Sequence, residues 1–262
     1  MSIYHKLIAA VMAAVGCAAA APSLALEYPA KMIKIVVPYP PGGGADDVAR
    51  LIAQKLGARL KQSVVVENRS GATGMIGTAA VARAEPDGYT IALTHADTMT
   101  INPLVYKNIS YSPERDFIPV AMEGVRPFVL AISADVPAKS LAEFIRLCRE
   151  NPGKYTFSSP GIGSSAQIAM EMLKQTAGID MQHVPYQGAG PAVTAVVAGQ
   201  ISAMMGSLTT MLPHHKSGKV RILGVTLDQR LPVVPEIPTL VEQGAQVTAV
   251  DWYGFAVPAK TP

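Results

Sequence analysis

The sequence predicts an α/β protein of two lobes, each with a mostly parallel sheet flanked by helices. Apolar runs of strand length alternate with segments of helical periodicity, the order that builds doubly wound sheets. This alternation occurs in residues 26–127 and again in residues 128–249, and a last strand-like stretch at 250–262 returns to the first lobe. With 262 residues, 49% of them hydrophobic and 16% charged, the chain can bury two such cores.

The first lobe begins with a nearly continuous apolar run at residues 32–37, as expected for a parallel strand covered on both faces. A helix over residues 47–60 follows, because its apolar residues recur at helical spacing: Val48, Leu51, Ile52, Leu56 and Leu60. The rest of the lobe is expected as strand, helix and strand at residues 64–66, 75–84 and 89–93.

The second lobe repeats this order. A strand at residues 128–132 precedes a helix that begins after Ser140, because Ser140 and Glu143 have the spacing of a capping box. Asn151-Pro152-Gly153 ends that helix. Strands are also expected at residues 155–158, 201–205 and 220–226, and helices at residues 167–177 and 191–198. A strand at residues 252–257 belongs to the stretch that returns to the first lobe.

Glycine-rich loops lie between strand and helix in both lobes. The first, PYPPGGGADD at residues 38–47, aims backbone N–H groups and the positive end of a helix at one point, which favours an anion. A phosphate-binding loop would continue with Lys and Ser or Thr, whereas Ala45-Asp46-Asp47 follows here. Similar loops at residues 158–165 and 70–74 indicate a cleft lined by helix starts, which suits carboxylates. The alternative is that the glycines only permit tight turns.

Residues 1–25 have the pattern of a secretory signal peptide. Lys6 precedes an apolar run at residues 7–21, which is short for a membrane span, and Ser23-Leu24-Ala25 supplies small residues for cleavage. The mature chain is therefore expected to be exported. Cys17, which follows small residues, leaves a lipoprotein anchor as an alternative.

The sequence contains no constellation that predicts catalysis, a metal or a cofactor. None of the histidines considered has around it, at helical or strand spacing, the set of further ligands that a metal site needs: His95, His183 and the adjacent His214 and His215. Ser159 has no Gly-x-Ser-x-Gly elbow around it. The formal net charge of +3 is spread along the chain, which argues against a nucleic-acid surface.

Cys148 is expected to be a small core residue. It shares an apolar helical stripe with Leu141, Phe144 and Ile145. After removal of the signal peptide it would be the one thiol of the chain, so no internal disulfide is expected.

Several motifs occur in a fixed order along the mature chain: Pro40 to Asp46 with Ala49-Arg50, Val66-Glu67-Asn68-Arg69, Pro86-Asp87-Gly88-Tyr89, Asn102-Pro103, Asp116-Phe117, Val184-Pro185-Tyr186 with Gly188, Gly199-Gln200, Pro238-Thr239-Leu240 and Trp252. With them the sequence resembles the tripartite tricarboxylate transporter substrate-binding proteins of Gram-negative bacteria, also called Bug receptors. The resemblance covers essentially the whole mature chain.

The resemblance implies a type II periplasmic-binding-protein fold, with two α/β lobes hinged about a cleft. It implies a periplasmic receptor that is not an enzyme and needs no cofactor. Its ligand would be a small carboxylate, such as a dicarboxylic acid, an acidic amino acid or an aromatic acid. Its partner would be a membrane transporter of the tripartite tricarboxylate type or a periplasmic sensor domain, and the receptor itself would be a monomer.

Carried over to this sequence, the resemblance implies ligand contacts from both lobes. From the first lobe these are Tyr39, Gly42, Gly43, Asp46, Thr94 and Asp97. From the second lobe they are Ser159, Gly163, Ser164, Ser165 and Ser207.

The sequence departs from the family pattern in three places. Gln167 stands where His is frequent, and Gly206 stands where Asp is common, so the ligand of a relative should not be transferred. The chain stops at Pro262, whereas the family usually continues through helices that pack on the first lobe. A truncated chain would expose apolar surface there. A nonfunctional truncated paralogue is therefore one alternative. An exported enzyme acting on a small carboxylate, on the same two-lobe scaffold, is the other.

Overall fold

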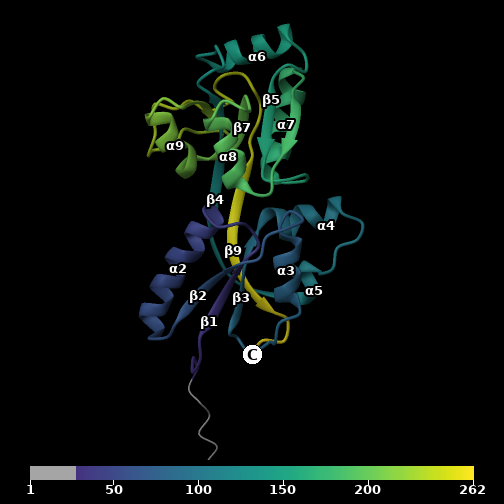
Figure 1. Ribbon diagram of the computed structural model, residues 1–262, viewed down its shortest axis with the longest axis vertical. Coiled ribbons are helices and arrows are strands. Elements are labelled where there is room, and N and C mark those ends of the chain that lie inside the picture. The colour runs from purple at the N-terminus through teal and green to yellow at the C-terminus, as the bar shows by residue number, and fades with distance from the viewer. Residues whose placement is uncertain (1–27) are drawn as a thin grey trace, which may run out of the picture. The chain divides into compact units, whose positions relative to one another are not determined.

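The computed structural model describes residues 28–262. The predicted signal peptide and Cys17 lie outside the described residues. Residues 31–262 are one unit, and this unit contains two α/β lobes joined by shared strands (Figure 1). No helix within residues 28–262 is long and apolar enough to cross a membrane.

The first lobe has a sheet with the strand order β2-β1-β3-β9-β4. The pairs β1–β2 and β1–β3 are parallel, whereas β9 runs antiparallel to β3. A π-helical turn, η1, follows β3 and contains Asp97. The elements are β1 (Ile33–Val37), α2 (Gly44–Leu60), β2 (Val64–Asn68), α3 (Met75–Ala82), β3 (Thr90–His95), η1 (Asp97–Ile101), α4 (Asn102–Val105), α5 (Pro113–Asp116) and β9 (Val250–Pro258).

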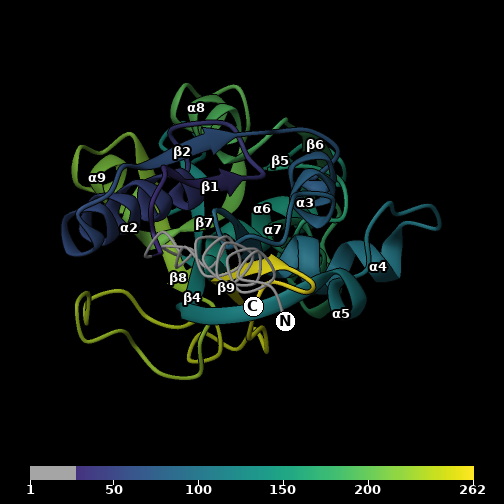
Figure 2. The same cartoon turned by 90° about the horizontal axis from the view of Figure 1, so that it is seen from below.

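Side-chain alternation along β1 explains the two layers of helix around this sheet. Ile35 and Val37 pack with α2, while Val36 points to the opposite face and packs with α3. The helices α2 and α3 accordingly lie on either side of β1 in both views (Figures 1 and 2).

The second lobe has parallel strands β5, β6 and β7, with β4 antiparallel to β7 and β8. The helices α6 and α7 cover one face around Phe157, and α8 and α9 cover the other around Met204. The elements are β4 (Phe117–Ser133), α6 (Leu141–Glu150), β5 (Thr156–Ser159), α7 (Ser165–Ala177), β6 (Gln182–Pro185), α8 (Ala189–Val197), β7 (Ala203–Ser207), α9 (Leu208–Lys216) and β8 (Val220–Val225). Cys148 is fully buried on α6, as its stripe predicts.

Strand β4 belongs to both lobes and is much longer than the strand expected at residues 128–132. Its residues 117–127 pair with β9 in the first lobe, and from Phe128 onward it pairs with β7. The prediction of a strand that starts at 128 was wrong because Pro119, Gly124 and Pro127 interrupt the strand pattern. Proline is tolerated here because this half of β4 is an edge strand.

The first half of β4 is uncovered among residues 28–262. Ile118, Val120, Met122 and Val125 are all exposed, between 39% and 64%, and one edge of the strand has no partner there. An exposed apolar edge strand is a ready template for association with another chain.

The resemblance implies a monomer, but this uncovered edge leads us to expect that the purified protein self-associates with rising concentration. The V120K/M122K double variant should stay monomeric under the same conditions. Two lysines on the edge oppose strand pairing by charge and solvation. Sedimentation velocity across a concentration series measures the effect. The L51K variant, which changes an exposed leucine on α2, is the matched control. A wild-type protein that remains monomeric throughout would contradict this expectation.

Candidate functional site

A cavity of about 80 Å³ lies where the two lobes and the shared strands meet. The first lobe contributes the loop before α2, the first residues of α2, and His95 and Asp97. The second lobe contributes the starts of α7, α8 and α9 and the end of β7. Phe128, Val193, Met204 and Met205 form an apolar part of the wall, while backbone and polar side chains form the rest.

The start of α2 faces the cavity without a side-chain cap. Gly43 is its N-cap residue, in an extended conformation, and makes no capping hydrogen bond through a side chain. The N–H groups of Gly44 and Ala45 in the first helical turn therefore have no intrahelical acceptor. The preceding Gly42 has φ of +82°, which explains the need for glycine there.

The start of α8 is uncapped in the same way and lies opposite. Its N-cap residue is Gly188, at φ of +107°, with no side-chain cap. A Cβ atom placed on Gly43 would lie 3.9 Å from the Cβ atom of Ala189 on α8. Two helix starts, one from each lobe, thus present unpaired N–H groups to the same small space.

Tyr253 on β9 adds a hydroxyl at this point. The side chain lines the cavity, the residue is only 8% exposed, and its hydroxyl makes no hydrogen bond within residues 28–262. This oxygen would lie 3.4 Å from a Cβ atom placed on Gly44. Burial and the nearby Asp251 raise the pKa of Tyr253, so the phenol keeps its proton and can donate. The Arg126 guanidinium lies 4.3 Å from the ring centroid and adds positive charge nearby.

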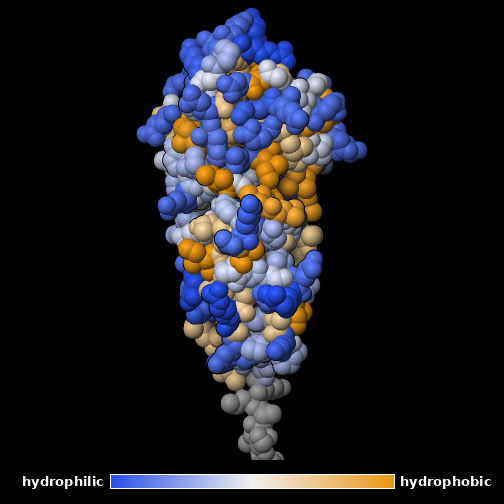
Figure 3. Space-filling model, turned by 90° about the vertical axis from the view of Figure 1, so that its right-hand side faces the viewer, coloured by the Kyte–Doolittle hydropathy of each residue, from blue (hydrophilic) through white to orange (hydrophobic). Residues whose placement is uncertain are grey.

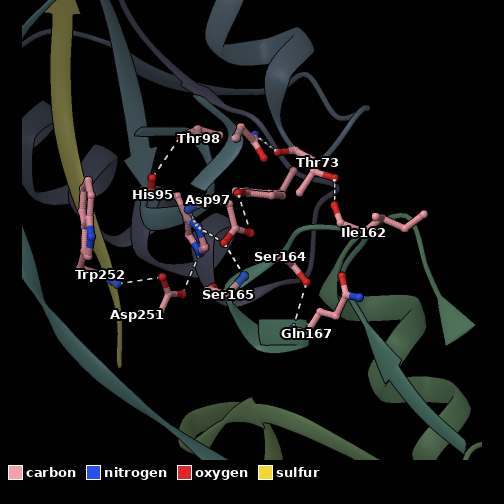
Figure 4. A network of polar contacts seen from close by, with 12 residues as sticks. Thr73, His95, Asp97, Thr98, Ile162, Ser164, Ser165, Gln167, Asp251 and Trp252 are labelled. Atoms are coloured by element: carbon pink, nitrogen blue, oxygen red, sulfur yellow. Dashed lines mark hydrogen bonds and ion pairs between the residues drawn. The ribbon is translucent and has the colours of Figure 1, made fainter. Parts of the chain in front are cut away.

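The starts of α7 and α9 are already satisfied by protein groups. The Ser164 hydroxyl accepts the N–H of Gln167, and the Ser207 hydroxyl accepts the N–H of Thr210. The N–H of Ser165, the first residue of α7, donates to Asp97 Oδ1 at 2.8 Å (Figure 4). This last bond crosses from the second lobe to the first.

His95 joins two buried carboxylates beside the cavity (Figure 4). Its Nε2 lies 2.7 Å from Asp251 Oδ2, and its Nδ1 lies 3.5 Å from Asp97 Oδ1. Burial lowers the pKa of His95, but Asp97 and Asp251 outweigh burial and raise it to about 10. The N–H of Asp97, 3.0 Å from Nδ1, opposes this rise because it needs an unprotonated nitrogen as its acceptor. Two full charges outweigh one amide dipole, so the direction remains upward.

The raised pKa of His95 has a consequence for stability. Between its unfolded value of 6.5 and its folded value of about 10, the folded state holds one proton more than the unfolded state, so stability decreases as the pH rises. We expect the free energy of unfolding to fall from about pH 7 to about pH 8.5, a range below the ordinary pKa of cysteine, by up to about 1.4 kcal/mol per pH unit.

Urea unfolding across that range measures the slope, and the ring resonances of His95 report its titration directly. The H95Q variant should lose this slope, and the H214Q variant should keep it. A His95 ring that titrates near its ordinary pKa, or a flat wild-type profile, would contradict the expectation.

Asp46 holds the first glycine loop in place and does not line the cavity. Its carboxylate accepts the Gly42 N–H at 3.0 Å, Arg50 Nε at 2.9 Å and Asn68 Nδ2 at 2.9 Å. Burial raises the pKa of Asp46, but the contacts with Arg50, Gly42 and Asn68 outweigh burial and lower it. Asn68 also donates to the carbonyl of Tyr39, which ties β2 to the same loop.

The structure brings five of the eleven predicted site residues to the cavity: Tyr39, Gly43, Asp97, Ser165 and Ser207. The other six do not line it: Gly42, Asp46, Thr94, Ser159, Gly163 and Ser164. The Ser159 hydroxyl lies 2.7 Å from His183 Nε2, and the Gly163 N–H donates to Gln167 Oε1. Thr94 lies beside Gly254, away from the cavity.

The predicted set omits Arg126, Asp251, Tyr253 and the start of α8. In the sequence, Trp252 and Tyr253 look like ordinary packing residues. Only the folded structure shows that Tyr253 lies at the cavity. The Gly188-Ala189-Gly190-Pro191 stretch did carry a signal, since glycines before an expected helix resemble the first loop. Of the two single-residue departures from the family pattern, Gly206 lines the cavity and Gln167 does not.

Two further polar contacts join the lobes beside this site. Thr73 Oγ1 and the Tyr106 hydroxyl both donate to the carbonyl of Ile162, at 3.1 and 2.8 Å. Exposed Leu104, Val105 and Ile162 lie in the same region, and Figure 3 shows apolar side chains gathered between the lobes on this face. Within residues 28–262, no three His, Cys, Asp or Glu side chains are grouped to hold a metal ion.

Comparison with known proteins gives a consistent result. The family model described as "Tripartite tricarboxylate transporter family receptor" matches residues 48–262. A protein from Pseudomonas sp. (strain P51), named for the tcbD-tcbE intergenic region, is 38% identical over 237 residues, which are 90% of this chain and 70% of the relative.

Solved structures agree with the family match. An R. palustris protein with adipate has 31% identity and a TM-score of 0.88, over 90% of this chain and 79% of that one. MatC from Rhodopseudomonas palustris, with bound malate, has 32% identity and a TM-score of 0.84, over 90% and 80%. The α/β periplasmic-binding-protein fold is therefore shown for this chain.

Proposed function

Because the chain belongs to the tripartite tricarboxylate transporter receptor family, whose members are binding receptors and not enzymes, we propose that it captures a small organic carboxylate between its lobes. It would hand this ligand to a membrane transporter of the tripartite tricarboxylate type; a periplasmic sensor domain is the alternative partner. The predicted signal peptide supports a periplasmic location for this activity. Anchoring through Cys17 is the alternative to a soluble form.

The observation that supports the proposal most is the pair of uncapped helix starts, α2 and α8, facing each other across the cavity. Each offers backbone N–H groups and the positive end of a helix dipole. A carboxylate between them would satisfy donors from both lobes at once, which gives a reason for the lobes to close on it. No cationic side chain needs to be buried against the ligand, so the large desolvation cost of such burial is avoided.

The proposal is supported further by the unpaired hydroxyl of Tyr253, which lies close to the start of α2. Because it lines the cavity, this hydroxyl is placed to donate a hydrogen bond to a ligand oxygen. Relatives with similar structures bind adipate and malate, which are small dicarboxylates.

The test is binding by the purified mature protein. Dicarboxylates, acidic amino acids and aromatic acids are screened by thermal shift, and the hits are measured by calorimetry. We expect at least one carboxylate to raise the melting temperature and its neutral amide analogue to have no effect. A folded protein that binds none of them would overturn the proposal and favour the nonfunctional paralogue. A bound carboxylate that is chemically altered after incubation would favour the exported enzyme.

A further inference from the structure

We propose that Asp97 is a specificity-determining residue, which makes the α7 side of the cavity accept a hydrogen-bond donor of the ligand. This inference rests on the proposed carboxylate receptor function. It concerns a hydroxyl or amino group carried by the ligand beside its carboxylate.

Asp97 occupies the position at the start of α7 that a ligand carboxylate could take. Its Oδ1 accepts the N–H of Ser165, the first residue of this 13-residue helix, at 2.8 Å. The helix start is therefore neutralised by the protein's own anion. Because α2 and α8 lack such a group, the helix starts around the cavity are not equivalent.

The second oxygen of Asp97 has accepting capacity left. Oδ2 accepts a long hydrogen bond of 3.4 Å from the Tyr39 hydroxyl, and the Ser165 side chain also contacts the carboxylate. The residue is 2% exposed and lines the cavity. A carboxylate offers about four lone-pair sites, so a buried oxygen with only a long hydrogen bond can still accept a further donor. The oxygen therefore favours a ligand that brings an N–H or O–H group.

His95, the cationic side chain between Asp97 and Asp251, is not free to bind the ligand. His95 directs Nε2 to Asp251 and Nδ1 to Asp97 (Figure 4), so both ring nitrogens are engaged by protein groups. Asp251 also lines the cavity, and its other oxygen accepts the N–H of Trp252 at 2.8 Å. With two carboxylates and one imidazole, this wall attracts donors and repels anions.

The cavity thus has two ends of opposite hydrogen-bonding character. The α2 and α8 starts with Tyr253 donate, and the wall from Asp97 to Asp251 accepts. A 2-hydroxy or 2-amino carboxylate matches both ends, since its carboxylate and its donor lie on neighbouring carbons. A site that pairs a ligand donor discriminates strongly against the analogue that lacks it.

Calorimetry with three acids on one carbon skeleton tests the inference: succinate, malate, which adds a hydroxyl, and aspartate, which adds an ammonium. We expect wild-type protein to bind malate or aspartate at least about tenfold more tightly than succinate. The D97N variant keeps an oxygen for the Ser165 N–H but presents an NH₂ donor to the cavity. Aspartate should then lose the most affinity, because an ammonium cannot accept a hydrogen bond from this NH₂ group. Malate should lose less affinity, because its hydroxyl can accept one.

The D228N variant is the matched control, since it removes the same charge from an exposed position of the second lobe and should keep the wild-type order. Succinate binding as tightly as the other acids in wild type, or a preference unchanged in D97N, would overturn the role of Asp97 while the receptor function stands. Failure of all carboxylates would instead overturn the receptor function. If D97N does not fold, the order of the wild-type affinities for the three acids alone decides whether the inference stands.

Discussion

Replacing Gly43 by valine is expected to abolish ligand binding and leave the fold intact. Gly43 has φ of −101° and ψ of 167°, an extended conformation that a β-branched residue adopts easily. A Cβ atom there would meet Ala189 at an ordinary contact distance of 3.9 Å. The two γ-methyl groups would fill the space between the starts of α2 and α8, so we expect the affinity for the carboxylate found in the screen to fall at least about 100-fold.

The neighbouring glycine is the matched control. G42A should destabilise the protein by about 1 kcal/mol, because Gly42 has positive φ, but it adds its methyl group where no atom lies within 4 Å. Calorimetry and thermal unfolding of both variants separate the two effects. Unchanged affinity in G43V would count against the space between α2 and α8 as the ligand site.

The D46A variant is expected to have the largest effect on stability. It removes the buried carboxylate that joins Gly42, Arg50 and Asn68 and leaves the Gly42 N–H and the Asn68 amide without this acceptor. Loss of one partner from such a group costs about 3 kcal/mol. Because the loop before α2 then loses its anchor, ligand affinity should fall as well, although Asp46 does not line the cavity.

Urea unfolding and calorimetry on D46A, D46N and D47A measure this. D46N keeps one accepting oxygen and should be intermediate, whereas D47A changes an exposed carboxylate in the same helical turn and should cost little. Equal stability of D46A and D47A would show that the Asp46 network does not hold the loop.

Local patterns were sufficient for most of the fold. The apolar run of β1 and the helical stripes of α2 and α6 gave elements that differ from the structure by at most a few residues. The sequence did not predict α9, because Pro213 interrupts its helical pattern. It also did not predict the first half of β4, because its partner β9 is more than 100 residues away in the chain. Such pairing leaves no local pattern.

The sequence located the loops of the site, but it did not determine where the side chains in those loops point. Gly43 acts through its backbone, so its place at the start of α2 was enough to place it at the cavity. Ser159 lies in the right loop, but its hydroxyl is engaged by His183 and by the carbonyl of Gly161. Asp46 turns back to its own loop. Tyr253 comes from β9, and its role depends on how that strand crosses the first lobe, which sequence periodicity does not encode.

The central claim is that helix starts from both lobes hold one carboxylate. Backbone amide resonances of ¹⁵N-labelled protein, followed during titration with the bound acid, test it most directly. The account predicts the largest shifts at Gly44 and Ala45 on α2 and at Ala189 and Gly190 on α8, saturating at the same ligand concentration. Shifts confined to one lobe, or centred away from these two helix starts, would contradict it.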